Sequence, residues 1–511
     1  MQHAIDAIPL LGDDSYLAQA ILKDRINSAD NLTIHHLPTE ILTQVFSHHV
    51  EAQQPFLQGY TSRFSKVECS APLVLSAVCR TWREIALDIP QLWTSPYIFL
   101  YSDNKLALQK EIIAEWFVRS RHLPLHISFF STRRLGSAFS ILSPVFDEVK
   151  AHSKRWVTLR LILSRYSYPV FTADLLDTPS LQRLQLWPRL DDRDDGPKFL
   201  LHKSILVEDV QIQNLSIWDF KVQWSALVVF RMRYISTDQV IELLRRAEKL
   251  ERCVFSNIIP TRAGHHLPPL PLTHHSLKDL VLQSSEMKEL EYILEHMVLP
   301  SLVQFVYSDT SLSALDEGRL SNHFPLHPFL SLFTRSRCSL KGFEMQALYT
   351  NTAADAELIE ILEQLPSVER LSLGSVGVYS SRAWLSDPFF TDHANFVSLT
   401  RLLPHLKEFH ITGTRAFSWD ALLAFLNLAH SHITSTTRSN RINVRLDLDI
   451  KPRRPCDYIP PHIVSQLADS RSDQAISLQI IDRVQGENWI QASLVHHWLD
   501  SVASSRRQPG S

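Results

Sequence analysis

A phrase that combines alternating apolar residues with a leading proline recurs along most of this chain and limits what it can fold into. Its form is Pro-x-apolar-x-x-apolar-x-apolar, with copies starting at Pro179, Pro300, Pro366 and Pro404. Copies without the proline contain Ile212/Leu215/Ile217, Leu227/Phe230/Met232, Leu250/Cys253/Phe255, Leu277/Leu280/Leu282 and Leu340/Phe343/Met345. Most starts lie about 15 to 40 residues apart, a range that overlaps the spacing of known structural repeats. We therefore expect a fold assembled from similar units.

Each copy predicts a turn followed by a short strand. The last two apolar positions alternate with polar ones, which is the period of a strand with one buried face. Helical stretches such as 240–247 and 358–365 lie between copies, so each unit is a helix, a turn and a strand. One unit cannot bury its own apolar faces, so successive units must stack into a parallel sheet with helices outside. The alternative is a conventional α/β domain, whose strands would be longer and apolar on both faces.

The same alternation occurs on both sides of these copies. It begins at 97–100, 125–130 and 157–163, with a helix over 111–120, and returns at 441–450 and 475–481. The sequence thus predicts an α/β fold in which residues 97–498 form one irregular leucine-rich-repeat solenoid, with parallel strands on its concave face. Residues 431–440 are expected to form a surface loop. The polar residues 499–511 are expected to form a disordered tail.

In such a solenoid the leucines of each strand are buried, so the residues between and after them face the open side. Tryptophan and arginine are common at binding hot spots because they combine a large contact area with directed polar contacts. We therefore predict that Trp187, Trp218, Arg231 and Arg233 bind a target protein. The alternative for the two tryptophans is packing against neighbouring strands or loops.

Two amphipathic helices are predicted near the N-terminus. Pro38 suits the first position of a helix, and Glu40 places negative charge where the helix dipole favours it. The apolar stripe of this helix contains Ile41, Leu42, Val45 and Phe46. A second helix is expected from about Pro72 to Pro90, with one broad apolar face formed by Val74, Leu75, Val78, Cys79, Trp82 and Ile85. Two helices this short need each other, and a partner, to bury these faces.

Three motifs in this region occur together in an informative order: Leu37-Pro38-Thr39-Glu40-Ile41-Leu42, Val78-Cys79-Arg80-Thr81-Trp82-Arg83 and Leu92-Trp93. In this combination they resemble an F-box. The resemblance implies a small helical bundle that docks on a Skp-family adaptor, which links it to a cullin scaffold in a ubiquitin ligase. The residues that it places at the adaptor are Leu37, Pro38, Ile41, Leu42, Val45, Val78, Cys79 and Trp82.

The predicted F-box-like domain covers residues 34–95 and differs from a compact F-box by an inserted loop at 51–70. Such an insertion is inexpensive because the entropy of loop closure grows only logarithmically with loop length. The interrupted form resembles the F-box-like proteins of mushroom-forming fungi. Residues 1–33 are expected to be a helical or flexible segment.

Charge and cysteine usage restrict the partners and the compartment. The formal net charge of the 511 residues is −3 with mixed signs along the chain, which gives no electrostatic footprint for nucleic acid. The five cysteines contain no Cys-x-x-Cys pair, a pattern typical of reduced thiols. No secretory signal and no apolar run of about 20 residues is evident, so no membrane partner is expected. We expect a cytoplasmic or nuclear protein.

Motifs for chemistry are missing from the sequence. There is no glycine-rich dinucleotide or phosphate loop and no Gly-x-Ser-x-Gly elbow. Adjacent histidines, such as those at 496/497, point in different directions and form a poor chelate. We therefore expect no catalytic, metal or cofactor site and no enzymatic activity. The predicted function is substrate recognition in an SCF-type E3 ubiquitin ligase. The alternative is a non-catalytic repeat scaffold whose F-box-like bundle is only an N-terminal cap.

Overall fold

The computed structural model describes most of the chain between residues 37 and 506. The described residues are 37–53, 71–100, 106–130, 143–164, 168, 178–188, 206–219, 222–261, 271–284, 287–309, 326–346, 353–374, 387–391, 403–415, 417–435, 442–449, 458–469, 476–483 and 485–506. They belong to two compact units. Unit 1 spans Met1–Val207 and Trp218–Gln223, and unit 2 spans Glu208–Ile217 and Trp224–Ser511.

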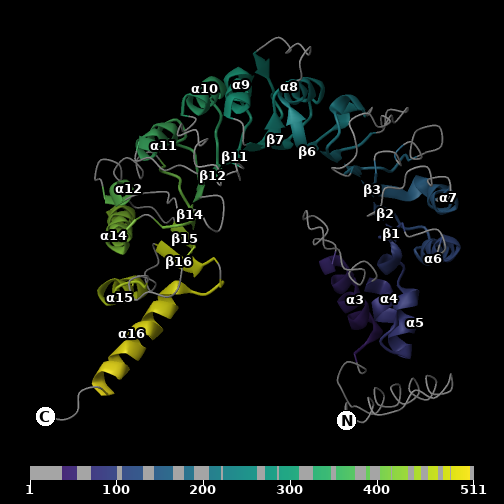
Figure 1. Ribbon diagram of the computed structural model, residues 1–511, viewed down its shortest axis with the longest axis horizontal. Helices are drawn as coiled ribbons and strands as arrows, with labels where there is room; N and C mark the ends of the chain where they lie inside the picture. Colours follow the sequence, from purple (N-terminus) through teal and green to yellow (C-terminus); the bar gives the residue numbers. More distant parts are fainter. Residues whose placement is uncertain are drawn as a thin grey trace. The chain divides into compact units, whose positions relative to one another are not determined.

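Unit 1 starts with a small helical bundle (Figure 1). Its elements are α3 (Thr39–Gln53), α4 (Ala71–Ser76), α5 (Arg80–Asp88) and the 3-10 turn η4 (Pro90–Trp93). Pro38 precedes α3, and its carbonyl accepts the amides of Ile41 and Leu42 at 3.0 and 3.1 Å. The helix continues three residues into the loop expected at 51–70, because Glu51, Ala52 and Gln53 are good helix formers. Residues 1–33 and 54–70 lie outside the described residues.

The single helix expected between Pro72 and Pro90 is two helices. The chain turns at Ala77 and Val78, and Cys79 adopts an extended backbone with φ −154° and ψ 175°. Cys79 is the N-cap of α5, and its Sγ accepts the amide of Trp82 at 3.4 Å. The prediction of one broad apolar face was therefore wrong, because the break changes the direction in which the side chains before and after it point.

The rest of unit 1 alternates strands with helices. The strands β1 (Tyr97–Phe99), β2 (Leu125–Phe130), β3 (Trp156–Ile162) and β4 (Arg183–Leu186) pair in parallel, each with the next. Helix α6 (Leu106–Arg119) lies between β1 and β2 in the chain, and α7 (Ser143–Ala151) with the 3-10 turn η7 (Ser153–Arg155) precedes β3. These strands begin within one residue of the expected positions.

Unit 2 contains a longer parallel sheet. Its strands, in order of pairing, are β5 (Asp209–Gln213), β6 (Val229–Ser236), β7 (Arg252–Ile259), β9 (Asp279–Ser284), β11 (Gln304–Asp309), β12 (Gly342–Gln346), β13 (Arg370–Gly374), β14 (Glu408–Gly413), β15 (Ile442–Leu448) and β16 (Ile476–Asp482). A separate parallel pair joins β8 (Leu272–Thr273) to β10 (Met297–Val298).

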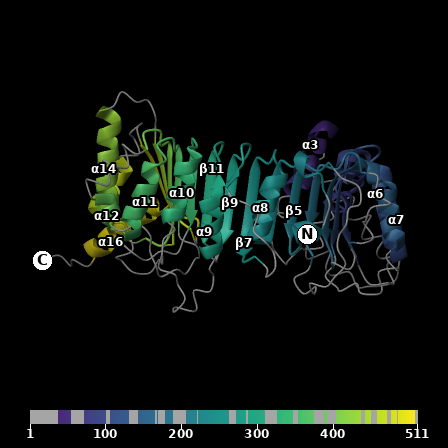
Figure 2. The same cartoon turned by 90° about the horizontal axis from the view of Figure 1, so that it is seen from above.

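Helices cover one face of this sheet (Figures 1 and 2). They are α8 (Thr237–Arg246), α9 (Met287–His296), α10 (Leu326–Ser336), α11 (Ala353–Glu363), α12 (Asp387–Thr391), α14 (Trp419–Ser435), α15 (Pro461–Asp469) and α16 (Trp489–Arg506). The apolar residues of the strands point toward the helices, as in the fully buried pairs Phe305/Tyr307 and Leu371/Leu373. The intervening residues line the other face, which we call the open face.

The proline phrase has a simple geometric basis. In six copies the amide of the first apolar residue bonds to the carbonyl three residues earlier, at 3.0 to 3.2 Å: Leu181 to Thr178, Leu227 to Trp224, Leu250 to Ala247, Leu302 to Leu299, Val368 to Leu365 and Leu406 to Leu403. Where the phrase has a proline, it occupies the second position of this turn. Proline is favoured there because its ring fixes φ near the value that the turn needs. The turn ends each unit and directs the chain into the next strand.

For one copy of the phrase, the strand was predicted at the wrong residues. The copy Ile212/Leu215/Ile217 predicted a strand over its last two residues, but β5 ends at Gln213 and buries Val210 and Ile212. Asn214, which follows β5, has a φ of 54°, in the left-handed region that asparagine tolerates.

Two predicted irregular segments are partly helical. Helix α14 extends to Ser435, into the loop expected at 431–440, and α16 extends to Arg506, into the tail expected at 499–511. Neither stretch contains proline or glycine before the helix ends, so each helix propagates by one hydrogen bond per added residue. Within the described part of the chain, no helix is both long enough and apolar enough to cross a membrane.

Candidate functional site

Helix α3 carries two apolar stripes that point in different directions. Leu42 and Phe46 are buried, with 3% and 0% exposure, and belong to the core of the bundle. Leu37, just before the helix, and Ile41 and Val45 on it follow one another at a spacing of four residues and are all exposed. A spacing of four residues keeps side chains on one side of a helix. Ile41 and Val45 therefore share one side of the helix, and Leu37 is exposed just before its start.

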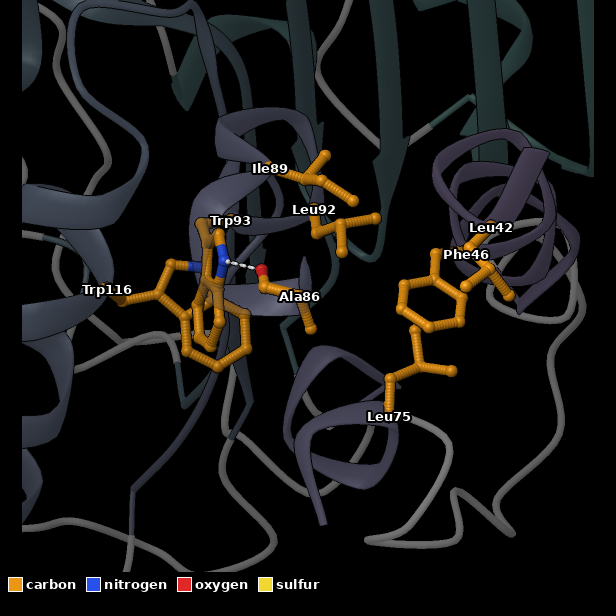
Figure 3. Packing of buried hydrophobic residues seen from close by; sticks show 8 residues of the cluster. All are labelled: Leu42, Phe46, Leu75, Ala86, Ile89, Leu92, Trp93 and Trp116. Atoms are coloured by element: carbon orange, nitrogen blue, oxygen red, sulfur yellow. Dashed lines mark hydrogen bonds between the residues drawn. The ribbon is translucent and has the colours of Figure 1, made fainter. Parts of the chain in front are cut away.

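The core beneath α3 is shared by every element of the bundle. It consists of Leu42, Phe46, Leu75, Ala86, Ile89, Leu92, Trp93 and Trp116 (Figure 3). The ring of Trp82 packs against Phe46, with ring centroids 4.8 Å apart, and the Trp93 indole donates to the Ala86 carbonyl at 2.9 Å. This core fixes α3 relative to α4 and α5, and so fixes the direction of the exposed stripe.

Further aliphatic side chains are exposed on the second half of the bundle. Leu73 and Val74 lie on α4, and Val78 lies in the turn before α5. Together with Leu37, Ile41 and Val45 they are between 37% and 49% exposed, and we call these six residues the docking face. Single exposed apolar residues are normal in proteins, but six on one small bundle make this bundle the candidate for contact with a partner.

The structure divides the eight predicted adaptor residues into exposed and structural ones. Leu37, Ile41, Val45 and Val78 lie in the docking face, and Pro38 is exposed beside them. Placing Leu42 at the surface was wrong, because it points into the core. Cys79 and Trp82 are half-buried and act within the bundle as the cap of α5 and as a partner of Phe46.

The sequence did not single out Leu73 and Val74 as docking residues. Val74 was assigned to the one broad apolar face of a single long helix, and Leu73 was not considered. The pattern held no signal for the break at Cys79, which separates the helix of Val74 from the helix that carries Trp82.

Beyond the bundle, α6 is packed onto the same core. Trp116 from α6 meets Trp93 edge to face, with centroids 4.9 Å apart, and the Arg119 guanidinium lies 4.7 Å from the centre of the Trp93 ring. A cation over an indole ring adds attraction beyond apolar burial. The bundle is thus attached to the first strand-helix unit by packed side chains and not only by the connecting chain.

The predicted target-binding tryptophans are not equivalent. Trp187 is only 8% exposed, and the Arg160 guanidinium lies 6.0 Å from its ring centre. This low exposure agrees with the alternative of packing against a neighbouring strand, and a role of Trp187 in binding stays a prediction. Trp218 is 38% exposed but lies in the 3-10 turn η10 (Ile217–Asp219), not on a strand. Its role in binding stays a prediction.

The two predicted arginines lie on the open face of unit 2. Arg231 and Arg233 alternate with the buried Phe230 and Met232 on β6. Arg231 Nη1 lies 2.7 Å from Asp209 Oδ1 on β5, and the Arg233 guanidinium lies 5.2 Å from the Tyr234 ring centre. Their placement agrees with the prediction, and their binding role stays untested.

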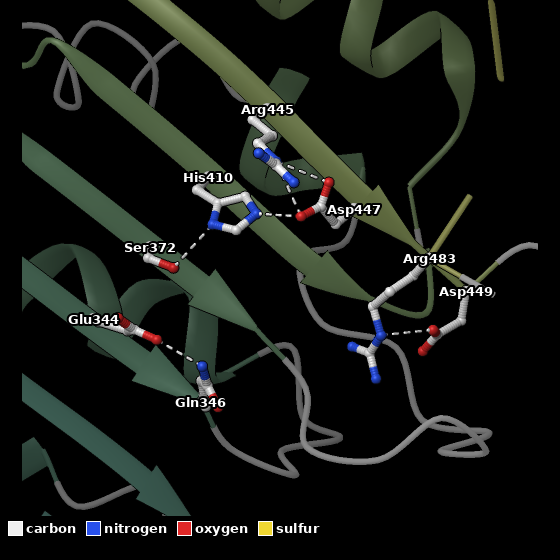
Figure 4. Close-up of polar contacts among 8 residues, drawn as sticks. All are labelled: Glu344, Gln346, Ser372, His410, Arg445, Asp447, Asp449 and Arg483. Carbon is white, nitrogen blue, oxygen red and sulfur yellow. Dashed lines mark hydrogen bonds and ion pairs between the residues drawn. The ribbon is translucent and has the colours of Figure 1, made fainter. Parts of the chain in front are cut away.

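A polar network crosses the open face near its other end (Figure 4). His410 Nε2 on β14 donates to Asp447 Oδ2 on β15 at 3.0 Å, and Ser372 Oγ on β13 lies 3.5 Å from His410 Nδ1. Arg445 Nε donates to both oxygens of Asp447 at 3.0 Å. A serine, a histidine and an acid in this order also form catalytic relays. Here, however, the backbone amides of these strands are engaged in pairing with the neighbouring parallel strands. The network joins the side chains of three neighbouring strands.

Two carboxylates in this region have shifted pKa values. Burial acts to raise the pKa of Asp447, but hydrogen bonds from Arg445 and His410 outweigh it and hold the pKa below its ordinary value. Burial raises the pKa of Asp449, although Arg483, whose Nε lies 3.2 Å from Asp449 Oδ1, acts in the opposite direction.

The lowered pKa of Asp447 predicts a pH-dependent contribution to stability. The ionised carboxylate stabilises the fold above the pKa of an unfolded aspartate, about 3.9, and this contribution is lost as pH falls through the lower folded pKa. We expect Asp447→Asn to reduce the free energy of unfolding at pH 7 and to have progressively less effect below about pH 4. Urea titrations of both proteins between pH 3 and 7 measure the difference. A difference that stays constant across this range would contradict the assignment.

One group among the described residues could hold a metal ion. The possible ligand atoms of His496, His497 and Asp500 lie within 4.8 Å of one another. The sequence argument against the histidine pair did not include Asp500, which lies one helical turn after His496. Both histidines also have structural contacts: His497 Nε2 donates to the Ile459 carbonyl at 2.7 Å, and the His496 ring stacks on Tyr458 at 3.9 Å.

Comparison with known proteins concerns the bundle. A family model described as F-box-like matches residues 34–99, which include the whole docking face and every residue of the core beneath it except Trp116. Comparison with the curated proteins finds no significant match. The matched range ends at Phe99, the last residue of β1, four residues after the end of the expected domain. The chain therefore carries an F-box-like domain at residues 34–99, which supports its identification as an F-box protein.

Proposed function

We propose that this chain is the substrate-recognition subunit of an SCF-type E3 ubiquitin ligase. Its F-box-like domain would bind a Skp-family adaptor and, through it, a cullin scaffold. The observation that carries this proposal is the docking face, whose six aliphatic side chains are held toward solvent by a well-packed core. Burying such residues against a partner is favourable by about 25 cal/mol per Å² of apolar area.

We further infer that the strand-helix units form an irregular leucine-rich-repeat solenoid whose open face binds the target. Repeated turns, parallel register and helices on one face of unit 2 support this inference. In such a ligase the chain itself performs no chemistry. It contributes proximity, because it holds the target near the ubiquitin-loaded enzyme that other subunits supply. A cytoplasmic or nuclear location is consistent with this role.

The competing proposal is a repeat scaffold in which the bundle only caps the first unit. The packing of Trp93 on Trp116 is what a cap requires, since it covers apolar surface of the next element. A cap does not need aliphatic residues on its outer side, however. The docking face therefore favours the receptor over the scaffold.

Affinity purification separates the two proposals. The full chain, tagged and expressed in eukaryotic cells, is expected to co-purify with a Skp-family adaptor and with a cullin. The variant Glu84→Ala, which changes an exposed residue of α5 outside the docking face, should behave identically. If neither subunit accompanies a folded chain, the receptor proposal fails and the scaffold proposal remains.

A further inference from the structure

Three valines occupy one position on neighbouring strands of unit 2. Val254 on β7 lies beside Val281 on β9, which lies beside Val306 on β11. All three are half-buried and alternate with buried core residues, so they face the open side of the sheet. We call these residues the valine strip. The same position on the other strands of unit 2 carries Gln211, Arg231, Glu344, Ser372, His410, Arg445 and Gln479.

Opposite charges mark the two ends of the strip. Arg231 on β6 is the register neighbour of Val254, and Glu344 on β12 is the register neighbour of Val306. Arg231 contacts Asp209 on β5, on the side away from the valines, and Glu344 accepts a hydrogen bond of 2.6 Å from Gln346 on its own strand. Both side chains thus lie in line with the strip, and these two partners lie off it.

The long sides of the strip are polar and internally paired. On one side Ser256 donates to Gln283 at 2.6 Å, and on the other Arg252 and Asp279 form an ion pair at 2.6 Å. Because these polar groups already bond to one another, they keep their partners when a ligand covers the valines and displaces water. An apolar centre with a satisfied polar border is the usual composition of a protein-binding surface.

We propose that the valine strip binds an extended segment of the target protein that runs across the strands. This segment places an acidic residue at Arg231, apolar residues over the valines and a basic residue at Glu344. The proposal rests on the proposed function, since it names the class of segment that the receptor recognises. A nucleic acid fits poorly, because Glu344 would repel its phosphates.

The geometry also sets the spacing of the two charges in the ligand. From β6 to β12 there are four steps between neighbouring strands, each about 4.8 Å, which gives roughly 19 Å. An extended chain advances about 3.3 Å per residue, so the acidic and basic residues should lie about six positions apart.

Peptide selection on the full chain tests this proposal. A displayed library of random 12-residue peptides is selected on wild-type protein and on the double variant Arg231→Glu/Glu344→Lys. Wild type should enrich an acidic and a basic residue about six positions apart around an apolar centre. The double variant should enrich the same spacing with the two charges exchanged. Identical motifs from both proteins, or no charged pair from wild type, would overturn the proposal.

A second variant guards against misfolding of the double variant. Val281→Thr keeps the side-chain shape and should weaken binding of the best wild-type peptide by roughly tenfold, since a buried apolar group becomes polar. Gln479→Thr, at the same position on β16, should leave binding unchanged. Unchanged affinity in Val281→Thr would also overturn the proposal. All of these variants should still bind the Skp-family adaptor. A failure of the peptide experiment alone therefore contradicts the valine-strip proposal and not the proposed function. A failure of adaptor binding alone contradicts the proposed function and not the valine-strip proposal.

Discussion

Replacing Ile41 and Val45 with aspartate is expected to abolish adaptor binding and to leave the chain folded. Both side chains are exposed members of the docking face, so the core beneath them keeps its contacts. Each buried aliphatic side chain contributes about 1.5–3 kcal/mol, and a carboxylate in its place also loses hydration at the interface. The combined loss should exceed about 100-fold in affinity, as measured by calorimetric titration.

A matched control lies on the same helix. Gln44→Asp adds the same charge at an exposed position outside the docking face and should change the affinity by less than about threefold. Circular dichroism verifies that both variants are folded. If the double variant binds the adaptor normally, or if Gln44→Asp is equally damaging, the docking face is not the adaptor site.

Replacing Trp93 with alanine should unfold the bundle. The indole is completely buried, meets Trp116 and Arg119, and donates to the Ala86 carbonyl. Truncating a buried tryptophan costs roughly 3–5 kcal/mol, and the carbonyl loses its partner in addition. Hydrogen exchange should show lost protection in α5 and α6, with unchanged protection in β12 to β14 of unit 2.

Trp498→Ala is the control for that experiment, because Trp498 on α16 is 64% exposed. Exposed substitutions usually change stability by less than about 0.5 kcal/mol. Equal protection of α5 and α6 in the two variants would show that Trp93 does not hold the bundle together.

Most of the parallel sheet could be predicted from the sequence because its signal is local and repeated. A strand such as β13 needs only two buried leucines, 371 and 373, flanked by polar residues and preceded by a turn that proline favours. The exception is β5, which ends at Gln213 and is followed by Asn214 with a φ of 54°. No hydrophobic pattern encodes that conformation, and the following Leu215 and Ile217 continued the alternation.

The docking face was predicted only in part, for two physical reasons. Helix α3 is apolar on two sides, and periodicity cannot distinguish the side that meets the core, with Leu42, from the side that meets a partner, with Ile41 and Val45. The second half of the face depends on the extended backbone at Cys79. A helical projection assumes an unbroken helix, so it placed Val74 and Trp82 on one face although they lie on separate helices. The burial of Trp187 could not be decided from the sequence, because alternation does not show how much of a side chain its neighbours cover.

Titration of the purified full chain with a purified Skp-family adaptor tests the central claim most directly. The predicted result is saturable binding with one adaptor per chain, which the Ile41→Asp/Val45→Asp variant lacks. The contradicting result is a chain that unfolds cooperatively, and is therefore folded, yet releases or absorbs no binding heat and shows no complex by size-exclusion chromatography.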